Sequence, residues 1–120
     1  MRKRAAVNKV NLILCLHNHQ PVGNFDHIFQ EHYDRAYGPF LDVYEKYAGL
    51  PLGLHCSGPL WDWILENKPD YIERIRALVE KESVELLAGA YYEPILTMIP
   101  ERDRVSQITM MQEFILNIFG

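Results

Sequence analysis

Three short apolar runs, each followed by a longer segment with helical spacing, constrain most strongly what this chain can fold into. The runs cover residues 10–16, 51–56 and 84–88. The first run is almost continuously apolar, which favours a strand buried on both faces, as in a parallel sheet. The order strand, helix, strand, helix, strand, helix is typical of a parallel sheet with helical crossovers. We therefore expect the α/β class, as part of a barrel or of a doubly wound sheet.

The helical segments have recognisable boundaries. They are predicted over residues 25–47, 60–67, 70–81 and 100–120. We expect Gly38-Pro39 to break or kink the first segment, because proline lacks a backbone N–H. Pro69 and Pro100 each stand where a helix is expected to begin.

The number of strands is small for a closed fold. Three parallel strands would leave two open sheet edges, and a complete βα barrel needs about 250 residues. The chain has 120 residues, and its last predicted helix stops at residue 120 with nothing to cover it. We therefore expect this chain to be a piece of a larger domain.

Charge and the amino-terminal sequence narrow the classes of partner and location. With 12 Lys and Arg against 16 Asp and Glu, and no basic cluster beyond residues 2–4, a nucleic-acid partner is not expected. The run 10–16 is too short to span a membrane, and it leads into His17 rather than a cleavage site. We expect a cytoplasmic protein without a membrane segment. Cys15 and Cys56 lie inside apolar runs and are expected to be buried free thiols.

Polar residues follow or interrupt the predicted strands. Ligands of parallel α/β sheets gather beyond the carboxyl ends of the strands. His17 and His19 stand at the end of the first strand, where alternate residues share one side, so both imidazoles could reach a common metal ion or substrate. The alternative is a pair of histidines that caps the strand and binds loop backbone.

Glu85 lies inside the third apolar run, where an unpaired buried carboxylate would be costly. It is expected either to face a polar barrel interior or to stand at a sheet edge with its side chain in water. His55, with only Cys56 beside it, does not make a closed metal site, and Glu93 is expected to pair locally in its loop. Trp61 and Trp63 fit packing better than sugar stacking.

Three motifs follow one another along the chain. They are His17-Asn18-His19-Gln20-Pro21, then His55-Cys56-Ser57-Gly58-Pro59-Leu60, then Val84-Glu85-Leu86-Leu87-Ala88-Gly89 with Tyr92-Glu93-Pro94. Their order and spacing together resemble the amino-terminal part of the catalytic domain of glycoside hydrolase family 57. The resemblance covers essentially the whole chain and is closest to the 4-α-glucanotransferase and α-amylase branch.

The resemblance implies an incomplete (β/α)7 barrel, with residues 1–120 as an amino-terminal fragment of about three βα units. It also implies a retaining enzyme acting on an α-1,4-glucan or maltooligosaccharide. In such enzymes one carboxylate attacks the anomeric carbon and a second carboxyl group, about 5 to 5.5 Å away, protonates the leaving oxygen. Water as acceptor gives hydrolysis, and a glucan hydroxyl gives transfer. No metal or organic cofactor is implied.

The resemblance also assigns roles to particular residues. His19 and Glu85 fall on positions that bind the sugar next to the scissile bond, and His17 and Gln20 support them. The family's nucleophilic glutamate and acid/base aspartate come from later strands. The resemblance therefore implies no catalytic residue in this chain, and we expect the isolated chain to be inactive.

Two other classes stay open. One is a metal-dependent hydrolase or deacetylase on a related barrel, with His17 and His19 as ligands. The other is a non-catalytic remnant or interaction subunit, which would pair its open sheet edges with the missing part of the barrel or with a second copy.

Overall fold

The computed structural model describes residues 9–47 and 49–120, so the basic residues 2–4 lie outside the described residues. The strands are β1 (Leu14–Asn18), β2 (Leu52–Cys56) and β3 (Val84–Leu86). The helices are α1 (Asp26–His32), α2 (Gly38–Tyr44), α3 (Gly58–Asn67), α4 (Pro69–Glu80) and α5 (Glu101–Phe119). A π-helical segment η1 (Tyr33–Tyr37) and two 3₁₀ segments, η2 (Glu45–Tyr47) and η3 (Leu96–Met98), complete the described elements. The predicted order of strands and helices is confirmed.

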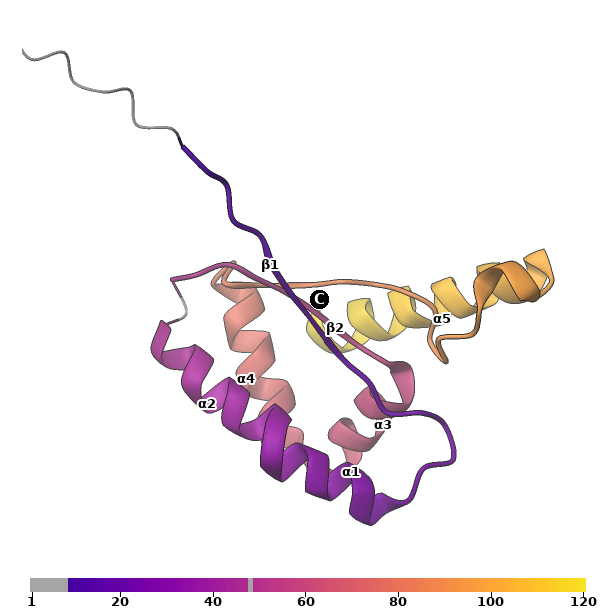
Figure 1. The fold of residues 1–120 in the computed structure, drawn as a ribbon, viewed down its shortest axis with the longest axis horizontal. Helices are drawn as coiled ribbons and strands as arrows, with labels where there is room; N and C mark the ends of the chain where they lie inside the picture. Colours follow the sequence, from indigo (N-terminus) through magenta and orange to yellow (C-terminus); the bar gives the residue numbers. More distant parts are fainter. Residues whose placement is uncertain (1–8, 48) are drawn as a thin grey trace, which may run out of the picture.

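The three strands form one parallel sheet in the order β1-β2-β3. Leu14 lies opposite Leu52, and Leu52 lies opposite Val84. Figure 1 shows helices α1 to α4 gathered on one side of the strands. Each strand pairs with the next one in the chain and its crossover helices stay on the same side, which is the arrangement of consecutive βα units in a barrel. A doubly wound sheet would carry helices on both faces.

The two faces of the sheet differ in burial. Leu52, Leu54 and Cys56 point toward the helices and are almost completely buried, and Val84 continues this row on β3. The residues between them in sequence point the other way, because side chains alternate along a strand. On that open face, Cys15, His17 and Glu85 are exposed. In a barrel this is the face that looks toward the interior.

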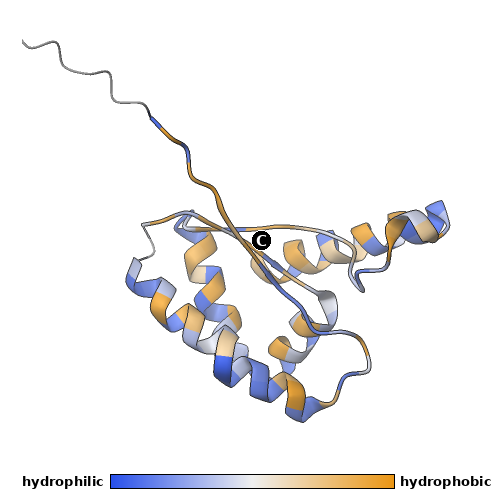
Figure 2. Cartoon of the chain, in the orientation of Figure 1, coloured by the Kyte–Doolittle hydropathy of each residue, from blue (hydrophilic) through white to orange (hydrophobic). Residues whose placement is uncertain are grey.

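The predicted first strand differs from the observed one. Residues 10–13 are extended but unpaired, and Val10 is 88% exposed. Figure 2 shows this hydrophobic segment leading away from the helices before it enters β1. The expectation of burial on both faces is wrong, because in the described residues helices cover one face only. For the same reason Cys15 is exposed, whereas Cys56 is buried as predicted; both are free thiols.

The first helical segment changes its hydrogen-bond pattern just before Gly38-Pro39. The Gly38 N–H donates to the carbonyl of Tyr33, five residues earlier, which produces the π-helical turn of η1. Pro39 has no N–H with which to continue the regular pattern. The irregularity expected at Gly38-Pro39 therefore takes the form of a π-helical segment, and the helical run continues through it.

Helices α3, α4 and α5 enclose the rest of the core. Trp61 is 1% exposed, and its ring lies 5.3 Å from that of Phe119 at the end of α5. Trp63 stacks on Phe29 of α1, so both tryptophans pack in the interior, as the sequence favoured. Met111 of α5 is fully buried as well. None of the described helices combines the length and hydrophobicity needed to cross a membrane.

Candidate functional site

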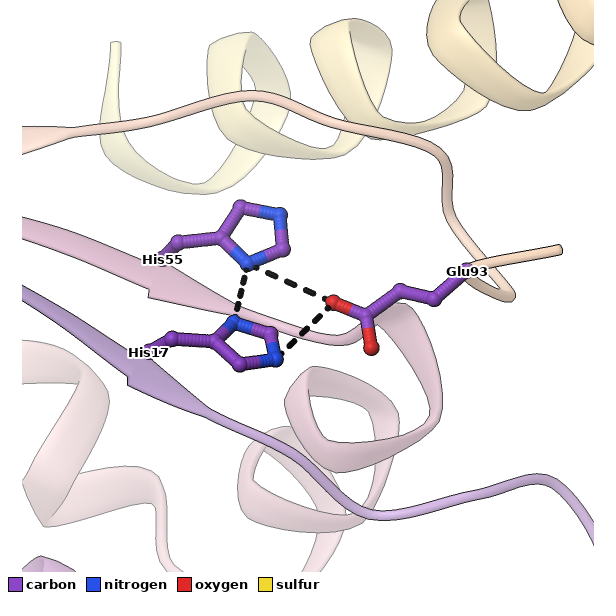
Figure 3. A group of neighbouring side chains, drawn as sticks. All are labelled: His17, His55 and Glu93. Carbon is purple, nitrogen blue, oxygen red and sulfur yellow. Dashed lines mark hydrogen bonds and ion pairs between the residues drawn. The ribbon is translucent and has the colours of Figure 1, made fainter. Parts of the chain in front are cut away.

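Four side chains meet on the open face of the sheet, at the carboxyl ends of the strands. His17 comes from β1 and His55 from β2, and the two residues are direct partners in the sheet register. Glu93 comes from the turn after β3, and His19 follows directly on the end of β1. Figure 3 shows the His17 and His55 rings side by side, with the Glu93 carboxylate pointing toward both.

The parallel register accounts for the contact between the two imidazoles. The rings of His17 and His55 are stacked, with centroids 4.9 Å apart and an angle of 26° between their planes. Their Nδ1 atoms are 2.7 Å apart and share a hydrogen bond. Gly89 lies on the other side of His55, and a side chain there would meet the ring, since an added Cβ would lie 2.7 Å from His55 Nε2.

Glu93 joins the three histidines. Its Oε1 lies 3.4 Å from His17 Nε2 and 3.4 Å from His55 Nδ1, and its Oε2 accepts a hydrogen bond from His19 Nδ1. The backbone of Glu93 is left-handed, with φ 51°, and its N–H donates to the carbonyl of Ala90. This turn directs the carboxylate back over the sheet.

The negative charge of Glu93 selects the imidazole tautomers. A neutral imidazole offers one N–H and one lone pair. If His17 carries its proton on Nε2, that N–H faces the carboxylate and its Nδ1 accepts the proton of His55 Nδ1–H. Burial lowers the pKa of His55 below its ordinary value of 6.5, although Glu93 opposes this shift. The site therefore favours a neutral His55.

Gln20 fixes the loop that carries His19. Its side chain is buried, and its amide donates to Tyr37 Oη and contacts His32. Its backbone N–H donates to Ser57 Oγ, and the Ser57 hydroxyl donates to the Gln20 carbonyl. The Tyr37 hydroxyl also donates to the carbonyl of His19. These bonds attach the loop after β1 to the start of α3 and to the first helical segment.

Glu85 lies on the same open face but not within the histidine cluster. It is opposite Gly53 in the register, which in turn is opposite Cys15. Cys15 precedes His19 by four residues, or about 13 Å along an extended strand. The Glu85 side chain is exposed. Both expectations for Glu85, a barrel interior and a sheet edge in water, agree with this position.

The structure thus brings His17 and His19 together, with ring centroids 5.9 Å apart, and adds two residues that the sequence ranked low. Glu93 was expected to pair locally, and this is wrong, since its partners come from β1 and β2. His55 ranks low in the sequence because His55 and Cys56 alone do not make a closed metal site. Its position at the end of a strand, like that of His17, was the signal that could have found it.

The arrangement has the chemistry of a polar binding site. Imidazole and carboxylate groups can donate to and accept from hydroxyls, and the same groups are ligands for metal ions. The strands hold them in fixed relation, at the edge of the sheet where parallel α/β folds bind ligands.

Fold and site together define three consecutive βα units of a barrel, with a candidate ligand-binding site at the carboxyl ends of their strands. The family model of glycosyl hydrolase family 57 matches residues 13–120, and this chain belongs to that family. An alpha-amylase of Pyrococcus furiosus is 43% identical over 111 residues, which make up 92% of this chain and 17% of that protein. A 4-alpha-glucanotransferase of Thermococcus litoralis is 42% identical over 108 residues, or 90% of this chain and 16% of that protein.

A solved structure supports the same assignment. The crystal structure of the Thermococcus litoralis 4-alpha-glucanotransferase superposes with a TM-score of 0.88 at 41% sequence identity, over 91% of this chain and 17% of that one. The prediction of a partial βα barrel is confirmed. This chain spans about one sixth of the length of the curated relatives that it matches, between 16% and 17%.

Proposed function

We propose that residues 1–120 form the amino-terminal part of the catalytic barrel of an enzyme that hydrolyses or transfers α-1,4-glucans. The observation that carries this proposal is the family match over residues 13–120, with relatives named alpha-amylase and 4-alpha-glucanotransferase. The ligand is an α-glucan or a maltooligosaccharide, and the protein acts in the cytoplasm.

In this proposal His19 and Glu85 bind the sugar beside the scissile bond. The contacts of His19 support its part. Glu93 accepts a hydrogen bond from His19 Nδ1–H, so the lone pair on His19 Nε2 remains free to accept a hydrogen bond from a sugar hydroxyl. His17 supports His19 indirectly, because both imidazoles contact the Glu93 carboxylate. Gln20 supports His19 because its backbone carbonyl accepts a hydrogen bond from Ser57 and so holds the loop that carries His19. Fixed hydrogen bonds of this kind orient the sugar ring for attack.

The catalytic carboxylates are proposed to lie outside these 120 residues. Glu93 supports this view because its two oxygens already face three imidazoles. The rest of the barrel would cover the open face and supply a nucleophile and an acid/base group about 5 to 5.5 Å apart. The chain alone is then a substrate-binding part without turnover.

A chimera tests the proposal. Residues 13–120 replace the matching segment of the Thermococcus litoralis 4-alpha-glucanotransferase, and redistribution of maltooligosaccharides is measured. We expect an active chimera, with activity reduced by roughly a hundredfold or more in His19→Ala and in Glu85→Gln, because misplacing a substrate can cost about that much. His27→Ala, on the exposed surface of α1, is the control. A folded chimera whose His19 and Glu85 variants keep full activity would contradict the assigned roles, and turnover by the 120-residue chain alone would contradict the missing catalytic pair.

A further inference from the structure

We propose that His17, His55 and Glu93 bind one divalent transition-metal ion of the zinc type. The ligand atoms are His17 Nε2, His55 Nδ1 and Glu93 Oε1. This site goes beyond the proposed glucan chemistry, which needs no metal, and it differs from the pair of His17 and His19 suggested by the sequence.

The distances fit a tetrahedral ion. Zinc binds imidazole nitrogen and carboxylate oxygen at about 2.0 to 2.2 Å, which puts two ligands of a tetrahedron about 3.3 to 3.5 Å apart. Glu93 Oε1 lies 3.4 Å from each of the two histidine nitrogens, and ligand atoms of the three residues all lie within 4.8 Å of one another.

The donor set favours a particular class of ion. Two imidazoles and one carboxylate suit zinc and its neighbours among the transition metals, whereas calcium and magnesium prefer oxygen ligands. Three protein ligands leave a fourth position, which is the pattern of zinc sites that keep a water or a ligand. Because His17 is half-exposed, this position is accessible from the open face of the sheet.

The scaffold holds the ligands before the ion arrives. His17 and His55 are register partners on neighbouring strands, and the left-handed turn at Glu93 aims the carboxylate between them. The position of His19 differs, since its Nδ1 binds the second carboxylate oxygen. Glu93 would then bridge the ion and His19, so the ion also fixes the orientation of a proposed sugar-binding residue.

Binding exchanges one set of interactions for another, starting from the tautomers in which His17 Nε2 and His55 Nδ1 carry the protons. His17 moves its proton from Nε2 to Nδ1, and His55 moves its proton from Nδ1 to Nε2. Each imidazole then presents a lone pair to the ion. The hydrogen bond between the two Nδ1 atoms is lost, because the His55 lone pair then belongs to the metal.

Calorimetric titration of the tag-free 120-residue chain with ZnCl₂ tests the site. We expect one ion per chain, and affinity reduced roughly tenfold or more in Glu93→Gln and His55→Gln, since even outer partners of a metal site contribute that much. His27→Gln, which removes an exposed histidine of α1, should bind as the unsubstituted chain does, and MgCl₂ should give no saturable heat. Absence of saturable zinc binding, or equal affinity in Glu93→Gln and His27→Gln, would overturn the proposal.

A second measurement covers the case in which a variant fails to fold. In the unsubstituted chain, zinc should shift the ring ¹⁵N signals of His17 and His55 and exchange their tautomers, while those of His27 and His32 stay in place. Shifts confined to His27 or His32 would overturn the site. Failure of the glucan chimera leaves both measurements unaffected, so the two proposals fail separately.

Discussion

Replacement of Gly58 by alanine should destabilise the chain, although alanine is the better helix former. Gly58 opens α3, and an added Cβ would lie 2.2 to 2.4 Å from three ring carbons of Tyr91. Carbon atoms pack best about 3.5 to 4.0 Å apart, so the ring would have to move by more than about 1 Å. The Tyr91 hydroxyl donates to Asp62 over 2.6 Å, and its carbonyl accepts from the Gly58 N–H over 2.8 Å, so the ring is held in place.

The magnitude follows from these contacts. Overpacking typically costs about 1 to 3 kcal/mol, and loss of the bond to Asp62 adds about 1 kcal/mol. Alanine recovers at most about 1 kcal/mol of helix propensity. We expect a net loss of about 1 to 3 kcal/mol in the free energy of unfolding, which is a fall in Tm of roughly 4 to 12 °C.

Urea unfolding followed by circular dichroism measures this loss. Gly49→Ala is the matched control, because nothing lies within 4 Å of its added Cβ, and it should change stability by less than about 0.5 kcal/mol. In a Tyr91→Ala background the cost of Gly58→Ala should largely disappear. An equal cost in both backgrounds, or no cost at all, would refute the clash as the cause.

Three further outcomes are expected. A thiol reagent should label Cys15 in the native chain, whereas Cys56, whose pKa is raised by complete burial, should react at least about a hundredfold more slowly until the chain unfolds. Hydrogen bonds from Arg74 lower the pKa of Glu45 below its ordinary 4.5, so Glu45→Gln should lower stability at pH 6. This difference from the unsubstituted chain should vanish as the pH falls through the lowered pKa. Leu54→Ala should cost about 2 to 5 kcal/mol in urea unfolding, because Leu54 is buried in the core.

The sequence predicted the positions of the strands and helices more accurately than it predicted their pairing and burial. Local signals such as Pro69 and Pro100 marked where α4 and α5 begin, and the apolar runs located β2 and β3 to within two residues. The first strand was extended too far, since hydrophobicity alone predicted it from Val10 while its partner β2 begins only opposite Leu14. The start of the first strand is therefore set by its backbone pairing with β2 and not by the hydrophobicity of its residues.

The same distinction applies to the candidate site. The histidine pair and the position of Gln20 after the first strand are local in sequence, and both were found there. The role of Glu93 was missed, because it depends on a left-handed turn that carries a carboxylate 76 residues along the chain back to His17.

Sequence by itself determined the order of strands and helices, the family resemblance and the residues that stand at the strand ends. Only the tertiary structure decided that one face of the sheet stays open, that Cys15 is exposed on it, and that Glu93 faces both His17 and His55. The physical reason is that periodicity is a local property, whereas register and the side on which helices pack arise from contacts between distant segments.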